Sequence, residues 1–161
     1  MGKKGRELVK VNVSELLELL KKAYADEWIA YYAYKWAADT AHGMGAPHLT
    51  ELADKIADEE EEHADELAER ILELGGELPY GIEKLYDLAN CKRVDYPEDM
   101  SDLKGILRGL VEAEGCAIEV YNKILKWLSP CYDKDVKTFH LIEHILSEEI
   151  QHEEDFENLL L

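Results

Sequence analysis

Four long segments of this chain repeat apolar residues at spacings of three and four, the period of an amphipathic helix, and charged residues interrupt each repeat near its middle. The interrupting residues are all carboxylates or imidazoles: Glu27, Glu60, His63, Glu114, Glu149 and His152. An apolar stripe of this kind faces the core of a helical bundle, where ionised side chains are rare unless they are paired. The sequence therefore predicts an all-α four-helix bundle with a polar cluster at its centre.

The ends of the four helices follow from capping and helix-breaking residues. Ser14 and Ser101 are expected N-caps, and the Gly75–Gly76 pair ends the second helix. The predicted helices span residues of about 14–41, 48–74, 101–128 and 135–159.

The connection between the second and third helices, residues 75–100, is much longer than the other two. It is long enough to run the length of the bundle, which predicts two antiparallel helix pairs joined by a long crossover. A short helix is expected within it, at residues 82–89. Residues 1–13 form an expected N-terminal arm, and residues 1–161 are expected to be a single domain.

Charge and cysteine content exclude several functional classes. Against 36 Asp and Glu stand 18 Lys and Arg, a net charge of −18 that repels nucleic acids and attracts cations. No apolar run is long enough to span a membrane, and no apolar segment typical of a secretion signal follows the first residues. Cys91, Cys116 and Cys131 are too few for a disulfide framework, so a cytoplasmic location is expected.

Two of the interrupted stripes contain the same motif, Glu60-x-x-His63 and Glu149-x-x-His152. Residues three apart project from one face of a helix, so each Glu and His can reach the same metal pair. Four buried carboxylates would be very costly without compensating charge, and two divalent cations would neutralise them. Carboxylate and imidazole ligands fit iron or manganese and also accept zinc.

Each motif alone is also typical of a solvated acidic helix, because residues 58–63 read DEEEEH. Four coincident interruptions on four core stripes favour the metal site. On the third helix both Glu112 and Glu114 offer a carboxylate, and Glu114 is preferred because it lies on the leucine stripe.

The chain resembles the ferritin-like superfamily, and within it the Dps-like ferritins with a thiol pair, known as thioferritins. The phrases that carry the resemblance are ELGGELP at 73–79, LVEAEGCAIEVY at 110–121 and ILSEEIQHE at 145–153. Residues 63–72 also resemble the second helix of bacterioferritin.

This resemblance implies a role for each candidate residue. Glu27 and His63 would bind one iron, Glu114 and His152 the other, and Glu60 and Glu149 would bridge the two. The thiol pair would be Cys91 and Cys116, whereas Cys131 has no implied role. Bacterioferritin has a haem-binding Met directly after its bridging glutamate, and Glu61 stands at that position here, so no haem is expected.

The function implied by the resemblance is that of a ferroxidase, which oxidises Fe(II) preferentially with H2O2 and stores Fe(III) in a dodecameric shell. The alternative is a di-iron peroxidase or di-manganese catalase that uses the thiol pair without storing iron. A third class is a purely structural bundle or DNA-coating protein. The first residues carry Lys3, Lys4, Arg6 and Lys10, but with −18 overall we do not expect direct DNA binding.

Overall fold

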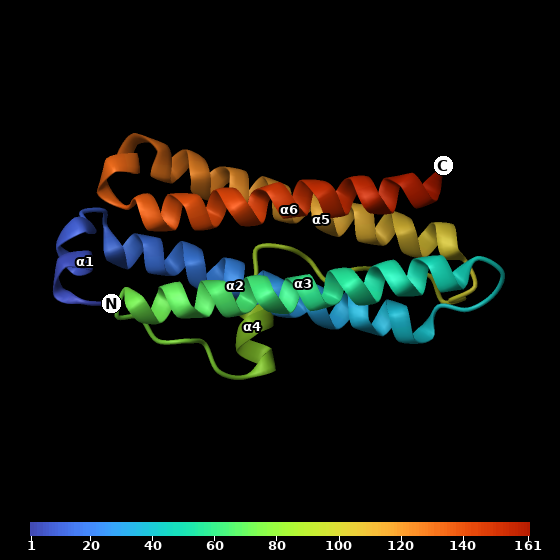
Figure 1. Cartoon of the computed structure of the whole chain (residues 1–161). Coiled ribbons are helices and arrows are strands. Elements are labelled where there is room, and N and C mark those ends of the chain that lie inside the picture. The colour runs from blue at the N-terminus through green and yellow to red at the C-terminus, as the bar shows by residue number, and fades with distance from the viewer.

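The structure, a computed structural model of residues 1–161, is an all-α four-helix bundle with a long crossover, as the sequence predicts. Figure 1 shows the long helices lying side by side as two antiparallel pairs. One pair is α2 (Val13–Thr40) with α3 (Ala46–Glu73), and the other is α5 (Leu103–Leu128) with α6 (Val136–Leu160). Three shorter helices complete the chain: α1 (Lys3–Leu8), α4 (Ile82–Leu88) and the 3-10 helix η1 (Ser129–Lys134).

Both expected N-caps are wrong, one by two residues and the other by one. Asn12, not Ser14, caps α2, because its side chain accepts a hydrogen bond from the Glu15 amide at 3.3 Å. Asp102, not Ser101, caps α5 through the Gly105 amide at 2.9 Å. In both places a second cap-forming residue lies within two residues of the predicted one, and Asn and Asp are as good caps as Ser.

The crossover runs from the end of α3 through α4 to the start of α5 and is held to the bundle near its middle (Figure 1). Cys91 forms a disulfide with Cys116 on α5. The buried carboxylate of Asp26 on α2 accepts hydrogen bonds from the Cys91 amide at 2.8 Å and the Asn90 side chain at 2.7 Å. These contacts hold the crossover beside the midpoint of α2.

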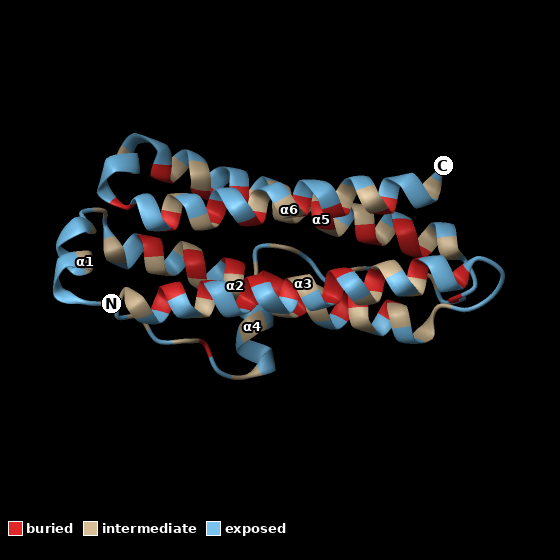
Figure 2. Cartoon of the chain, in the orientation of Figure 1, coloured by how far each residue is buried: buried red, intermediate tan, exposed pale blue.

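Two apolar clusters fill the two halves of the bundle, and the buried residues lie on the faces that the helices turn toward one another (Figure 2). One cluster includes Ile56, Leu110 and Phe156, and the other includes Leu20 and Ile145. Between them lies a band of buried Glu and His. None of the helices is both long and apolar enough to cross a membrane.

Candidate metal centre

Each of the four long helices contributes to the buried polar band. The six Glu and His residues predicted from the interrupted stripes all lie in it, and none has more than 3% of its surface exposed. Glu27 is on α2, Glu114 is on α5, and α3 and α6 each supply a Glu and a His. Glu112, the other candidate on α5, is exposed. The structure thus turns Glu114 into the bundle and Glu112 toward solvent.

The six side chains form two overlapping groups whose potential ligand atoms lie within 4.8 Å of one another. One group is Glu27, Glu60, His63 and Glu149, and the other is Glu60, Glu114, Glu149 and His152. Glu60 and Glu149 belong to both groups. The protein therefore has two adjacent buried metal-binding groups that share two carboxylates.

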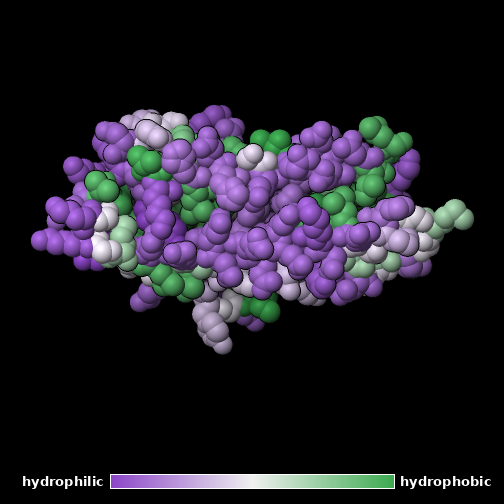
Figure 3. Space-filling model, viewed as in Figure 1, coloured by the Kyte–Doolittle hydropathy of each residue, from purple (hydrophilic) through white to green (hydrophobic).

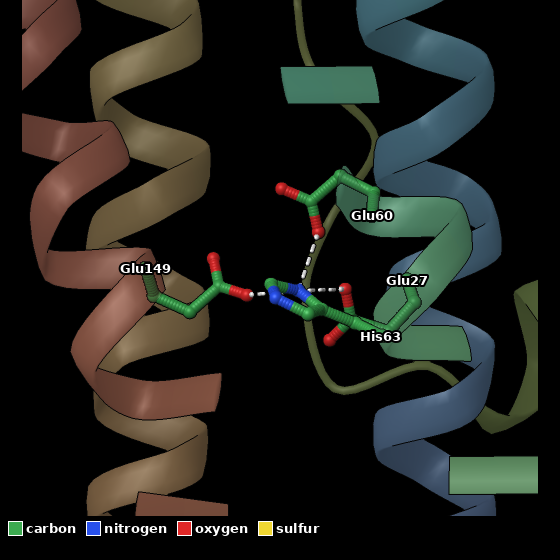
Figure 4. Close-up of side chains that lie close together, drawn as sticks. All are labelled: Glu27, Glu60, His63 and Glu149. Carbon is green, nitrogen blue, oxygen red and sulfur yellow. Dashed lines mark ion pairs between the residues drawn. The ribbon is translucent and has the colours of Figure 1, made fainter. Parts of the chain in front are cut away.

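The imidazole rings direct the same nitrogen into the cluster. His63 Nδ1 lies 3.1 Å from a carboxylate oxygen of Glu149, 3.5 Å from Glu60 and 3.7 Å from Glu27. Figure 4 shows these three carboxylates converging on the His63 ring from opposite sides of the bundle. His152 Nδ1 lies 3.4 Å from Glu60 and 3.9 Å from Glu114.

Most of the inward-facing atoms have no hydrogen-bond partner. The unpartnered atoms are Glu60 Oε1, His63 Nδ1, both oxygens of Glu114, both oxygens of Glu149 and His152 Nδ1. Buried polar atoms without partners are costly, and carboxylate oxygens cannot donate to one another when ionised. Two divalent cations would satisfy these atoms and cancel the carboxylate charge, so the residues present fit a di-metal centre.

The pKa values of the cluster reflect crowded charges in a buried space. Burial and the neighbouring Glu149 charge raise the pKa of Glu60 and of Glu114 well above the usual range. Burial lowers the pKa of His152, but the three carboxylates around His63 outweigh burial and raise its pKa. Burial alone would raise the pKa of Glu27, yet the neighbouring Glu60 and His63 and the hydrogen bond from Tyr121 lower it. Without a cation, protons neutralise part of the cluster.

Two buried tyrosines flank the cluster, and the sequence did not identify them as site residues. The Tyr121 hydroxyl on α5 donates a hydrogen bond to Glu27 on α2. Tyr34 on α2 lies near Glu114 on α5, and burial together with that charge raises the pKa of Tyr34. Each tyrosine follows the carboxylate of its own helix by seven residues, two helical turns, which is the signal that could have revealed them.

A small cavity of about 30 Å³ connects the cluster to the crossover. Its lining includes Glu27, Glu60 and Glu149 of the cluster together with Cys91 and Lys92 of the crossover. This volume admits on the order of one or two water-sized molecules. Cys131 lies apart from the cavity, as a free cysteine in η1.

A profile of the ferritin-like domain matches residues 17–161. The chain belongs to the ferritin-like family. This ferritin-like protein is 41% identical over 150 residues to the DNA protection during starvation protein of Pyrococcus furiosus, covering 93% of this chain and 79% of that relative. It is 31% identical over 147 residues to the bacterioferritin of Desulfovibrio desulfuricans, covering 91% and 74%.

Among solved structures, the ferritin-like fold is similar to that of a dodecameric thioferritin, the bacterioferritin-related protein of Bacteroides fragilis. The TM-score is 0.86 at 34% identity, and the match covers 94% of this chain and 87% of that one. An archaeal Dps homologue from Halobacterium salinarum matches with a TM-score of 0.83 at 25% identity, covering 92% and 81%. The predicted Dps-like, thioferritin-like resemblance is confirmed.

Proposed function

We propose that this protein is a ferroxidase that binds two Fe(II) ions per chain as substrate, oxidises them preferentially with H2O2 and stores the Fe(III) product. The observation that carries the proposal is the pair of buried Glu and His groups that share Glu60 and Glu149. The shared carboxylates lie between the two groups, so they can hold both substrate ions at once. Glu27 with His63, and Glu114 with His152, complete the two ends.

Oxidation of the ions as a pair explains why the site is double. Two Fe(II) ions supply the two electrons that H2O2 accepts, and with two protons the products are two Fe(III) ions and two water molecules. A lone Fe(II) ion supplies one electron and releases a hydroxyl radical. The burial of the cluster keeps bulk water and larger molecules away, while the small cavity beside Cys91 is large enough for peroxide.

Storage requires an enclosed space, and two surfaces of the chain support a dodecameric shell. Figure 3 shows that the face over α3 and α6 is largely hydrophilic, which fits the inner surface that would receive Fe(III). On α2 and α4, Tyr32, Trp36 and Tyr86 are exposed and line an apolar cavity of about 330 Å³, which fits a contact between subunits. Removal of iron together with peroxide would protect DNA without coating it.

The decisive experiment is anaerobic loading with excess Fe(II), a pulse of H2O2, and gel filtration with iron counted per chain. We expect many irons per chain to co-elute with a large particle, and Glu60→Ala to abolish both peroxide consumption and iron retention. Glu62→Ala, on an exposed position of the same helix, is the matched control. Unchanged iron retention in Glu60→Ala would exclude the proposed site and favour a structural bundle.

One observation favours a second candidate, a peroxidase or catalase that does not store iron. The Cys91–Cys116 disulfide lies at the cavity that leads to the cluster. A dithiol at this position can reduce H2O2 to two water molecules as it becomes the disulfide, and a partner would then have to reduce it again. About two metal ions per chain with continued peroxide consumption, dependent on added thiol, would favour this candidate.

A further inference from the structure

The two ring nitrogens of each cluster histidine lie in different surroundings. In both rings, Nδ1 faces the buried carboxylates and has no hydrogen-bond partner. Nε2 faces the rim of the bundle and is hydrogen-bonded to a carboxylate outside the group of six. His63 Nε2 lies 2.8 Å from Glu148 Oε2, and His152 Nε2 lies 3.1 Å from Glu59 Oε2.

These outer contacts cross between helices in both directions. Glu59 on α3 reaches His152 on α6, and Glu148 on α6 reaches His63 on α3. Both outer glutamates directly precede a shared inner carboxylate, so the two motifs read Glu-Glu-x-x-His. Adjacent residues on a helix point about 100° apart, so one glutamate faces the cluster and the other faces the rim.

The outer carboxylates are themselves anchored on the solvent side. Lys55, one turn before Glu59, lies 3.0 Å from it. His144, one turn before Glu148, lies 3.5 Å from it. Glu59 and Glu148 are 32% and 44% exposed as side chains, whereas the histidines that they contact are almost completely buried. Each histidine is therefore held at its outer edge by a carboxylate that costs little to keep ionised.

A neutral imidazole carries one proton, on either nitrogen, and a carboxylate can only accept a hydrogen bond. A carboxylate at Nε2 therefore keeps the proton there and leaves the Nδ1 lone pair directed into the cluster. It also opposes a flip of the ring that would exchange the two nitrogens. Carboxylates behind metal-binding histidines act in this way, and their removal commonly weakens metal binding about 10- to 100-fold.

We infer that Glu59 and Glu148 are positioning residues of the centre, each fixing the tautomer and orientation of the histidine on the opposite helix. The inference rests on the proposed function only in taking the inner cluster as a metal site. Neither residue touches the substrate ions in this role, because each lies on the far side of an imidazole ring.

The direct test is which ring nitrogen of the two histidines carries the proton in the Zn(II)-loaded protein, where both imidazoles are neutral. Solid-state 15N NMR of protein labelled at the histidine ring nitrogens reports which nitrogen carries the proton, and the His63→Gln and His152→Gln variants assign the signals. We expect Nε2 to be protonated in the unaltered chain. Glu148→Ala should mix the tautomers of His63 alone, and Glu59→Ala those of His152 alone. Glu148→Gln, which keeps an acceptor oxygen, should restore the Nε2-protonated form.

The second readout is anaerobic Co(II) affinity, followed by the visible absorption of the bound ion. We expect Glu59→Ala and Glu148→Ala each to weaken binding about 10- to 100-fold. Glu62→Ala and Glu154→Ala, exposed on the same two helices, should leave it within twofold. Tautomers that stay unchanged in Glu59→Ala and Glu148→Ala would overturn the inference and leave the proposed function standing. Tight Co(II) binding without peroxide-dependent Fe(II) oxidation would overturn the proposed function and leave the inference standing.

Discussion

At the scale of single residues, the structure contains a second buried charge cluster that needs no metal. Arg70 on α3 is 1% exposed and donates hydrogen bonds to Asp135 at 2.7 Å, Thr138 at 2.7 Å and Glu73 at 2.8 Å. Asp135 also caps α6 through the Thr138 amide. This network joins the end of α3 to the start of α6, and every charge in it has a partner of opposite sign.

Replacement of Arg70 by Met should therefore destabilise the protein strongly. The variant keeps the apolar stem but leaves Asp135 buried without its cation, and loss of one partner of a buried pair costs about 3–5 kcal/mol. Urea unfolding of the two proteins measures the difference in the free energy of unfolding. Arg108→Met, at an exposed position of α5, should change it by less than about 0.5 kcal/mol. A loss below 1 kcal/mol in Arg70→Met would contradict this account.

Glu73 makes the acid stability of the protein depend on the same network. Hydrogen bonds from Lys137 and Arg70 lower the pKa of Glu73 below its usual 4.5. A carboxyl with a lowered folded-state pKa stabilises the fold above pH 4.5, and this contribution disappears as the pH falls through the folded value. Glu73→Gln should thus cost up to about 1 kcal/mol at pH 7 and less at pH 3. Unfolding curves at both pH values check this, with the exposed Glu69→Gln as a pH-independent control.

At the scale of elements, the long helices and their inward faces could be predicted because spacings of three and four leave only one face for apolar residues. The same argument places Glu60 and His63 inside, since they interrupt the stripe. It could not find Asp26 or Arg70, because their burial depends on partners far away in the sequence, at Cys91 and Asp135. Nor could it choose between neighbouring caps such as Asn12 and Ser14, which differ little in free energy.

The crossover is the element whose order depends most on a few contacts. The disulfide between Cys91 and Cys116 closes a loop of 25 residues, which stabilises the fold by about 3.5 kcal/mol if it acts by restricting the unfolded chain. The double variant Cys91→Ser with Cys116→Ser should lose about this much, as measured by urea unfolding. The reduced unaltered protein should lose the same amount, whereas Cys131→Ser should lose much less. Equal stability of oxidised and reduced protein would show that Asp26 alone holds the crossover.

At the scale of the whole molecule, the bundle gives up stability at its centre to hold the metal-binding cluster. Two apolar clusters surround a band in which Glu60 and Glu114 are both at most 1% exposed. In the absence of cations each of these carboxyls must either ionise among like charges or keep a proton that it would lose in water. Either choice costs free energy, so the metal-free protein is less stable than its apolar packing alone would allow.

Replacement of Glu114 by Gln should separate stability from metal binding. The amide keeps the shape of the side chain and is neutral without taking up a proton, so the metal-free protein should gain about 1–4 kcal/mol of unfolding free energy at pH 7. The gain should shrink toward pH 4, where the carboxyl is protonated even in the unfolded chain. The stabilisation produced by added Zn(II) should fall at the same time, because one metal group loses a carboxylate. Urea unfolding with a chelator and with Zn(II) measures both effects, and the exposed Glu112→Gln serves as the control.

A Glu114→Gln protein that is less stable without metal would mean that the carboxylate stabilises the bundle by itself. The central cluster would then no longer require a cation to explain it.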